Sequence, residues 1–267
     1  MRDLLPTGLN DVIDDIGPMV VAYSGGADSA FLAVAATAVL GADRVRAITA
    51  VSPSLGADEL AHCQRLATEW SLAWSTVTTD EMADPRYVAN DTDRCYWCKS
   101  HLMDGLAPLA GAATVVLGVN TDDLGDHRPG QQAARERGAR FPLVEAGLAK
   151  ADVRALSLHI GLSTWDRPAA PCLSSRLPYG TPVTLGRLSA VELAERGLHR
   201  LGLGEVRVRH HGEVGLVEVP TGAIGSAAAR HTEIADVVRR AGFRFVALDL
   251  EGLESGRLNR SHQEGTS

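Results

Sequence analysis

Short apolar runs alternate with longer helix-like stretches over the first two-thirds of the chain. Residues 18–23 are apolar and end in a glycine turn, which is typical of a buried strand, and residues 29–40 continue as an Ala-, Leu- and Val-rich helix that ends near Gly41. The other elements expected here are strands at 45–51, 74–78 and 114–119 and a helix at 57–70. Strands that alternate with helices of this length predict an α/β fold, with a twisted parallel sheet covered on both faces.

A second region follows the proline-rich stretch at 165–182. Its expected elements are a helix at 185–201, strands at 205–211 and 214–219, a helix at 223–241 and a strand at 244–250. This order predicts a smaller α+β domain. We therefore expect a first domain over residues 1–170, a second over 171–255, and a disordered tail over 256–267, which is polar and rich in Gly and Ser.

Composition narrows the class of partners. The 267 residues carry a formal net charge of -7, which provides no general attraction to nucleic acid or to an anionic membrane, so we expect neither as a partner. We find no secretory signal and no apolar run long enough to span a bilayer. The four cysteines are too few for a disulfide scaffold, and these features together predict a cytoplasmic protein.

The turn after the first strand carries the candidate nucleotide site. It reads Ser24-Gly25-Gly26-Ala27-Asp28-Ser29. Gly25 and Gly26 let the backbone bring its N–H groups up to phosphate oxygens, and the following helix directs its positive end at the same anion. Ser24 and Ser29 add hydroxyl donors, whereas Asp28 is expected to hold Mg²⁺ or to orient the loop. The competing interpretation is an ordinary glycine turn, which six matching positions in a strand–helix context make less favoured.

This loop lacks the Gly-Lys-Ser/Thr ending of a Walker A motif, so γ-phosphoryl transfer is not the expected chemistry. It resembles the signature of the PP-loop ATP pyrophosphatases, a class with the fold of the adenine nucleotide alpha hydrolases. The resemblance implies that ATP is the nucleotide, that pyrophosphate is released, and that AMP is left on a substrate oxygen. The class includes amide synthetases and tRNA-thiolating enzymes, so the loop alone names no substrate.

Three further segments sharpen this resemblance. They are Asp93-Arg94-Cys95-Tyr96-Trp97-Cys98-Lys99, Gly118-Val119-Asn120-Thr121-Asp122-Asp123-Leu124-Gly125-Asp126-His127-Arg128-Pro129-Gly130 and Pro171-Cys172-Leu173-Ser174-Ser175-Arg176-Leu177-Pro178-Tyr179-Gly180. In this order and spacing they resemble the LarE family of ATP-dependent sacrificial sulfur transferases, which take part in making the nickel-pincer nucleotide cofactor of lactate racemase. The similarity continues to Gly252 and so covers nearly the whole chain.

The resemblance implies a pyridinium bis-carboxylate mononucleotide as the small-molecule substrate. A carboxylate is adenylated, and the thiolate of Cys172 displaces AMP. The C–S bond of Cys172 then breaks, which leaves a thiocarboxylate product and dehydroalanine in the protein. Cysteine is the nucleophile that needs least activation for the second step. The family also implies a homo-oligomer, a hexamer.

Each cysteine has an alternative interpretation. Cys172 would be a small buried hydrophobe if it followed the usual pattern of free cysteines, but its flanking prolines and polar neighbours favour an irregular loop. Cys95 and Cys98 are compatible with half of a zinc site, a redox pair or two packed thiols, and we favour a structural role. His62 and Cys63 are the candidates to complete a zinc site, although their spacing is not a recognised one.

An acidic run follows the strand at 114–119, where ligand sites of α/β sheets occur. Asp126 is the candidate active-site acid, and Asp122 and Asp123 are candidates for metal or ribose contacts; a solvated loop is the competing interpretation. Arg207 and Arg209 lie two positions apart on a predicted strand and so share a face that would suit a substrate phosphate.

Further candidates complete the site. Glu218, on the neighbouring strand, is a weaker metal or substrate candidate, and Ser175 and Arg176 join the substrate-binding set because they lie beside Cys172. One departure from the family concerns Glu254, which stands where the family usually has Arg. Arg257, three residues later, is the candidate replacement.

Three rival functions remain. A tRNA thiolase fits the acidic net charge poorly, and an ATP-dependent amide synthetase lacks a recognisable glutaminase partner domain. A nucleotide-binding regulator without catalysis would have the loop but no reactive cysteine, so Cys172 discriminates against it.

Overall fold

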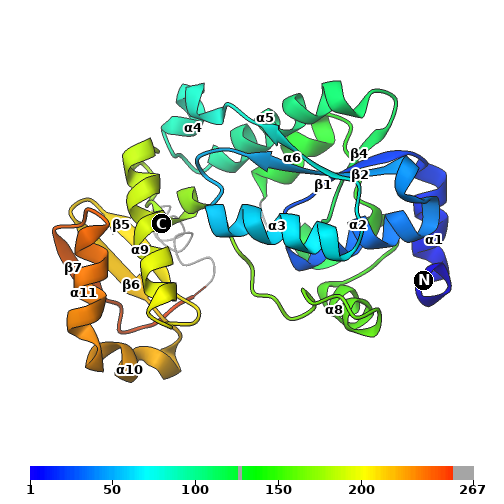
Figure 1. The fold of residues 1–267 in the computed structure, drawn as a ribbon. Helices are drawn as coiled ribbons and strands as arrows, with labels where there is room; N and C mark the ends of the chain where they lie inside the picture. The colour runs from blue at the N-terminus through cyan, green and yellow to red at the C-terminus, as the bar shows by residue number, and fades with distance from the viewer. Residues whose placement is uncertain (126–127, 255–267) are drawn as a thin grey trace. The chain divides into compact units, whose positions relative to one another are not determined.

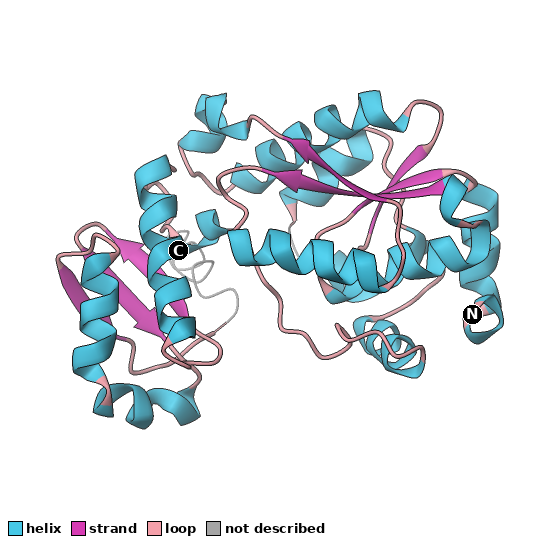
Figure 2. Cartoon of the chain, viewed as in Figure 1, coloured by secondary structure: helices cyan, strands magenta, loops and turns pink. Residues whose placement is uncertain are grey.

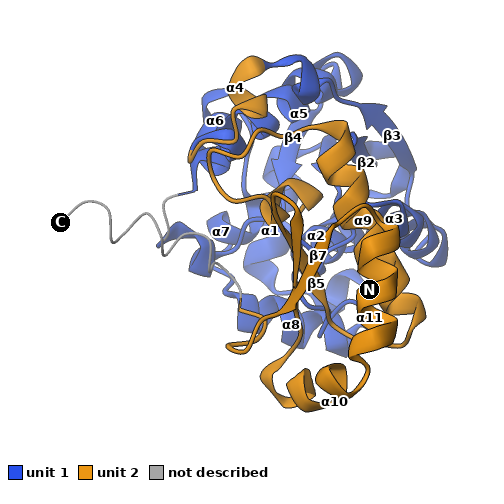
Figure 3. Ribbon diagram, turned by 90° about the vertical axis from the view of Figure 1, so that its left-hand side faces the viewer, with its two compact units in different colours: residues 1–84, 93–171 blue, residues 85–92, 172–267 orange. Residues whose placement is uncertain are grey.

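The computed structural model describes residues 1–125 and 128–254 (Figure 1). The chain forms two compact units. Unit 1 comprises Met1–Asp84 and Asp93–Pro171, and unit 2 comprises Pro85–Thr92 and the chain from Cys172 onward (Figure 3). Each unit contains one sheet with helices, as the colouring of Figure 2 shows.

Unit 1 is built on a four-stranded sheet in the order β3-β2-β1-β4. Its strands are β1 (Met19–Ala22), β2 (Val45–Val51), β3 (Trp74–Thr78) and β4 (Thr114–Leu117). All neighbouring strands are parallel, and Met19 of β1 is in register with Val45 on one side and Thr114 on the other. The predicted parallel sheet is therefore confirmed, with its fourth strand two residues shorter than expected.

Helices cover both faces of this sheet. They are α1 (Thr7–Ile16), α2 (Ala27–Leu40), α3 (Ala57–Glu69), α5 (Arg94–Ala110), α6 (Pro129–Glu136), α7 (Pro142–Glu145) and α8 (Lys150–His159). Met19 and Val21 join the apolar cluster formed with α1, α2 and α8, whereas Val20 joins the cluster formed with α5 and α6. Because alternate residues of a strand point to opposite faces, this division explains why β1 is apolar throughout.

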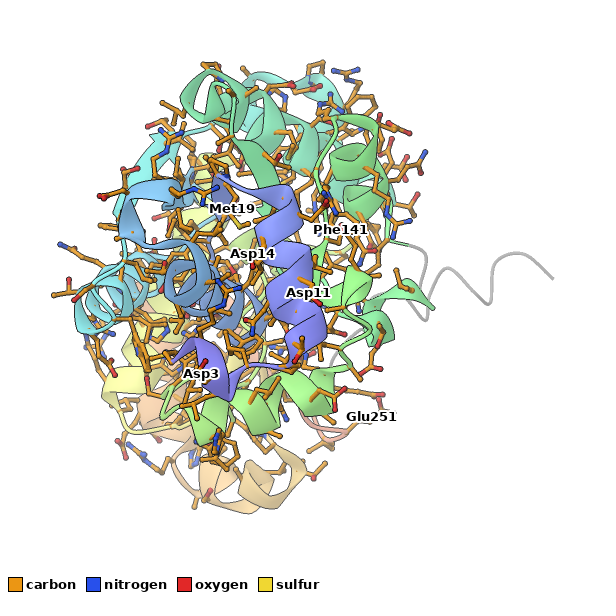
Figure 4. All side chains as sticks on the ribbon, turned by 90° about the vertical axis from the view of Figure 1, so that its right-hand side faces the viewer. Asp3, Asp11, Asp14, Met19, Phe141 and Glu251 are labelled. Atoms are coloured by element: carbon orange, nitrogen blue, oxygen red, sulfur yellow. The ribbon has the colours of Figure 1, made fainter. Side chains whose placement is uncertain are left out.

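The first helix shows how sequence pattern sets burial. Leu9 and Ile13 of α1 are fully buried, while Asp11 and Asp14 are exposed. Figure 4 shows Asp11 and Asp14 on α1, which crosses the front of unit 1 in that view. A spacing of four between the apolar positions places them on the side of the helix that packs against α2 and α7.

Unit 2 contains a three-stranded sheet in the order β5-β6-β7. Its elements are α4 (Pro85–Val88), α9 (Leu185–Arg200), β5 (Arg207–His211), β6 (Val214–Glu218), α10 (Ile224–Ala229), α11 (His231–Arg240) and β7 (Phe245–Leu248). β5 and β6 form an antiparallel hairpin, and β6 pairs with β7 in parallel. Gly212 opens the two-residue hairpin turn with φ of 64°, which favours glycine at that position.

Two features of unit 2 differ from the sequence prediction or were not foreseen. The single helix expected at 223–241 is wrong, because the chain breaks at Arg230 (φ -101°, ψ 21°), where the guanidinium donates to the carbonyl oxygen of Leu201 at 2.9 Å. Residues 85–92 also pack in this unit: the side-chain amide of Asn90 donates to the carbonyl oxygens of Pro178 and Thr181, both at 2.8 Å. Among the described residues, no helix has the length and apolar character needed to cross a membrane.

Candidate functional site

The turn between β1 and α2 closes on itself through its two serines. The backbone N–H of Ser24 donates to the Ser29 hydroxyl at 3.2 Å, and the two hydroxyl oxygens lie 3.0 Å apart. Gly25 has φ of 67°, a conformation that favours glycine, and Gly26 is the N-cap of α2 without a side-chain cap. A helix N-terminus of this kind, without a side-chain cap, can bind phosphate through its first N–H groups.

The turn is closely packed at two glycines and is held by one hydrogen bond from His62. A Cβ on Gly25 would lie 2.9 Å from the Sγ of Cys63, and a Cβ on Gly118 would lie 2.7–2.8 Å from backbone atoms of Asp28 and Ser29. Gly118 follows β4, so its lack of a side chain lets the start of α2 approach the end of that strand. On the other side of the turn, the Nε2 of His62 donates to the carbonyl oxygen of Gly25 at 3.0 Å.

Asp28 lies at the point where the sheet order reverses, between β1 and β4. The side-chain amide of Asn120, which follows β4 and is fully buried, donates to the Oδ1 of Asp28 at 3.1 Å. Burial raises the pKa of Asp28 above its usual range, while Lys150 and the hydrogen bond from Asn120 act in the opposite direction. Crevices at such reversal points are the usual ligand sites of open α/β sheets.

A cavity of about 170 Å³ opens at this turn. It is lined by Ser24, Gly26, Ala27, Asp28, Lys150 and residues 167–170. Pockets for whole small molecules usually begin at about 300 Å³, so this cavity suits part of a ligand, such as its phosphates. Lys150 and Arg167 bring two positive charges to the lining. The predicted loop residues Ser24, Gly26 and Asp28 thus line one cavity. Gly25, through its positive φ, and Ser29, through its hydrogen bonds to Ser24, set the conformation of the turn.

The predicted acidic candidates after β4 take part in local structure. The Oδ2 of Asp122 accepts from the backbone N–H of Lys150 at 3.0 Å, at the start of α8. Asp123 accepts from the backbone N–H of Asn120 and pairs with Arg128 at 2.7 Å. Their role as metal ligands stays a prediction, and Asp126 lies outside the described residues. Within the described residues, no group of three potential ligand side chains gathers in the way a metal site requires.

In unit 2, Cys172 is half-buried and begins a short 3₁₀ turn over Leu173–Arg176. Two arginines hold the backbone of this turn. The Nη1 of Arg176 donates to the carbonyl oxygen of Cys172 at 3.4 Å and to the hydroxyl of Ser175 at 3.0 Å. The Nη1 of Arg209 donates to the carbonyl oxygen of Ser175 at 2.8 Å.

Both arginines are themselves paired with buried glutamates. Arg176 contacts Glu195 of α9 through two hydrogen bonds of 2.9 and 3.1 Å, and Arg209 contacts both oxygens of Glu218 at 3.0 Å. Glu218, the predicted metal candidate, thus serves as the partner of an arginine. Glu195 also accepts from the backbone N–H of Val208, which belongs to the outer strand β5.

Arg207 differs from the other two arginines. It is only 6% exposed, yet no hydrogen bond from its guanidinium joins any residue in the described ranges 1–125 and 128–254. Burial, together with Arg176 and Arg209, lowers the pKa of Arg207, and Glu205 and Glu218 oppose this effect. Arg176 and Arg209 are each paired with a buried glutamate, so Arg207 is the arginine of this cluster that would suit an anion.

Four further residues discussed in the sequence analysis have a different outcome. Arg257, the candidate substrate contact, lies outside the described residues. Glu254 is exposed. Cys95 is exposed and Cys98 half-buried in the first turns of α5, and the described part of the chain offers them no third metal ligand, so the zinc interpretation gains no support.

The fold and the turn define unit 1 as a nucleotide-binding α/β unit of the PP-loop type. No protein-family profile matches the chain. It is 47% identical over 257 residues to an uncharacterized protein of Synechocystis, covering 94% of this chain and 96% of that protein. It is 37% identical over 250 residues to the pyridinium-3,5-bisthiocarboxylic acid mononucleotide synthase of Lactiplantibacillus plantarum, covering 92% and 91%. An uncharacterized protein of Methanocaldococcus jannaschii is 24% identical over 236 residues, covering 87% and 89%.

The similarity to the Lactiplantibacillus plantarum synthase extends along almost the full length of both proteins. The chain belongs to the LarE family of ATP-dependent sulfur transferases, and membership of this family implies the use of ATP. The resemblance found from the sequence is confirmed.

Several residues of these sites were missed from the sequence. Lys150 and Arg167 line the cavity from segments far from the turn, Asn120 donates to Asp28 from the segment after β4, and Glu195 of α9 pairs with Arg176. Only Asn120 carried a usable signal, because it directly follows a predicted strand on the same edge of the sheet.

Proposed function

We propose that the chain is an ATP-dependent sulfur transferase that acts on a carboxylate of pyridinium-3,5-biscarboxylic acid mononucleotide. The sulfur comes from Cys172, and the product is the corresponding thiocarboxylate, on the path to the nickel-pincer nucleotide. The observation that carries this proposal is the turn of Cys172, in which Arg176 and Arg209 hold the carbonyl groups of Cys172 and Ser175.

The cavity at the Ser24–Ser29 turn supports the first step. A substrate carboxylate oxygen attacks the α-phosphorus of ATP, the bond to the β-phosphate oxygen breaks, and pyrophosphate leaves with the electron pair. The N-terminus of α2, Lys150 and Arg167 would stabilise that leaving group. The residues also fit Mg²⁺, which commonly binds one carboxylate together with phosphates. Asp28 would hold this ion, which would neutralise phosphate charge.

Cys172 supports the second step. Its thiolate attacks the acyl carbon of the adenylate, and AMP leaves with the electron pair of the C–O bond. A base then removes the α-proton of Cys172, its Cβ–Sγ bond breaks, and the electron pair stays on the sulfur of the thiocarboxylate. Cys172 follows Ala170, which lines the ATP cavity, by two positions in the chain.

The three arginines support the choice of a mononucleotide. Arg207 is a buried cation without a described hydrogen-bond acceptor, and a phosphate monoester would supply acceptors and neutralise it. Ser175 and Arg176 would orient the substrate beside Cys172. From family resemblance we further propose that the protein is cytoplasmic and forms a homo-oligomer. Light scattering of the purified protein would test the oligomeric state.

Intact-protein mass spectrometry before and after turnover with ATP, Mg²⁺ and the pyridinium substrate tests the mechanism. We expect a mass loss equal to that of H₂S, located at Cys172 by peptide mapping. In Cys172→Ala, pyrophosphate release should continue while thiocarboxylate formation stops. Product formation with an unchanged protein mass would contradict sacrificial sulfur donation, and release of phosphate in place of pyrophosphate would contradict the class.

A further inference from the structure

Arg167 lines the cavity at the Ser24–Ser29 turn, and only one of its two terminal guanidinium nitrogens has a hydrogen-bond partner among the described residues. Its Nη2 donates to both carboxylate oxygens of Glu59, at 2.8 and 2.9 Å. Its Nη1 is buried and has no hydrogen-bond partner within the described residues. Buried donors in folded proteins are nearly always paired, so an unpaired one at a cavity points to an acceptor that binds there.

The neighbours of Arg167 indicate what that acceptor is. The same cavity is lined by Ser24, Gly26 and Ala27 of the turn that precedes α2, and by Lys150. These groups are hydrogen-bond donors or positive charges, and among the described residues of the lining only Asp28 is acidic. A planar guanidinium held by a carboxylate on one side can present its other nitrogen to phosphate oxygens.

Helix α3 contacts both Arg167 and the turn. Glu59 and His62 lie three positions apart and so share one face of the helix. Glu59 holds Arg167, and His62 holds the carbonyl of Gly25 in the turn. One helix therefore holds both the Ser24–Ser29 turn and Arg167, which line the same cavity.

We propose that Arg167 binds the pyrophosphate portion of ATP through its Nη1, with Glu59 as its positioning residue, and that this contact fastens residues 167–170 to the nucleotide. The inference rests on the proposed use of ATP at this turn and adds a specificity contact that links the nucleotide to the segment leading to Cys172. Pyrophosphate release then frees that segment.

Titrations with inorganic pyrophosphate in the presence of Mg²⁺, with ATP and with adenosine test this assignment. In Arg167→Gln we expect affinity for pyrophosphate and ATP to fall on the order of 10- to 100-fold, with adenosine binding unchanged. Arg167→Lys should also lose affinity, because an ammonium cannot keep both contacts. The matched control is Arg65→Gln on the exposed side of α3, which removes the same charge outside the cavity and should bind like the wild type.

Hydrogen exchange supplies a second readout. Pyrophosphate should slow exchange of the peptide that contains Ala169 and Ala170 in the wild type and not in Arg167→Gln. If Arg167→Gln folds poorly, Glu59→Gln/Arg167→Gln removes both charges and should show the same loss. Wild-type affinity for pyrophosphate in these variants would overturn the inference alone, whereas a wild-type protein that binds neither pyrophosphate nor ATP would overturn the proposed function.

Discussion

Asn120 and Asp28 are joined by a hydrogen bond of 3.1 Å that spans 92 positions of the chain. Asn120 also accepts from the backbone N–H of Asp122, so its side chain links the end of β4 to the first turn of α2. Because Asp28 lines the cavity at the Ser24–Ser29 turn, this amide orients the group that we propose to hold Mg²⁺.

We expect Asn120→Ala to lower the free energy of unfolding by about 1–3 kcal/mol, since it leaves buried polar groups unpaired. The KM for ATP should rise as well. Asn120→Asp should be worse on both counts, because it places a second carboxylate against Asp28. Urea unfolding and pyrophosphate-release assays measure the two effects. An unchanged KM in a folded Asn120→Ala protein would show that Asp28 needs no such orientation.

Substitutions of Gly118 and Gly8 by alanine distinguish a steric clash from the general effect of replacing a glycine. We expect Gly118→Ala to destabilise the protein by about 1–3 kcal/mol and to weaken ATP binding, because its Cβ would lie 2.7 Å from the backbone of α2. Gly8→Ala is the control, since nothing lies within 4 Å of a Cβ there, and in α1 it should be neutral or slightly stabilising. Thermal unfolding compares them, and equal melting temperatures would contradict the close approach.

The sequence predicted those parts of the fold that depend on neighbouring residues. The turn at Ser24–Ser29 was identifiable because its glycines and serines act within six positions of each other. Arg167, by contrast, reaches Glu59 across 108 positions, and no local pattern marks that pair. The helix break at Arg230 was also missed, and the contact made there, from its guanidinium to the carbonyl oxygen of Leu201, spans 29 positions.

In the candidate site, too, contacts between distant parts of the chain could not be predicted from the sequence. Arg207 and Arg209 were predicted as equivalent phosphate ligands because they share one face of a strand. The structure distinguishes them: Glu218 pairs with Arg209, and Arg207 has no described hydrogen-bond acceptor. Which of two like residues is paired depends on side chains from other elements, and spacing along the chain does not report that.

This difference predicts opposite results for two similar substitutions. Arg209→Met leaves Glu218 as an unpaired buried charge and should destabilise the protein by about 3–5 kcal/mol. Arg207→Met removes a buried cation that is repelled by Arg176 and Arg209, so it should cost little stability but raise the KM for the mononucleotide substrate. Thermal unfolding and substrate titration of both variants check this. A large stability loss in Arg207→Met with unchanged KM would mean that Arg207 is structural.

The raised pKa of Asp28 predicts how the stability of the folded protein changes with pH. Burial raises its pKa in the folded protein above the ordinary value of 3.8, so the folded protein binds the proton more tightly than the unfolded chain. Ionisation of Asp28 therefore costs stability, and this cost appears as pH rises through the folded pKa. Asp28→Asn removes the cost.

We expect the Asp28→Asn variant to be more stable than the wild type at neutral pH, with a difference that shrinks on acidification and vanishes below about pH 3.8. Its pyrophosphate release should be lost. Urea unfolding of both proteins across this range measures the difference, and a gap that widens toward low pH would show that Asp28 is stabilised as the charged form.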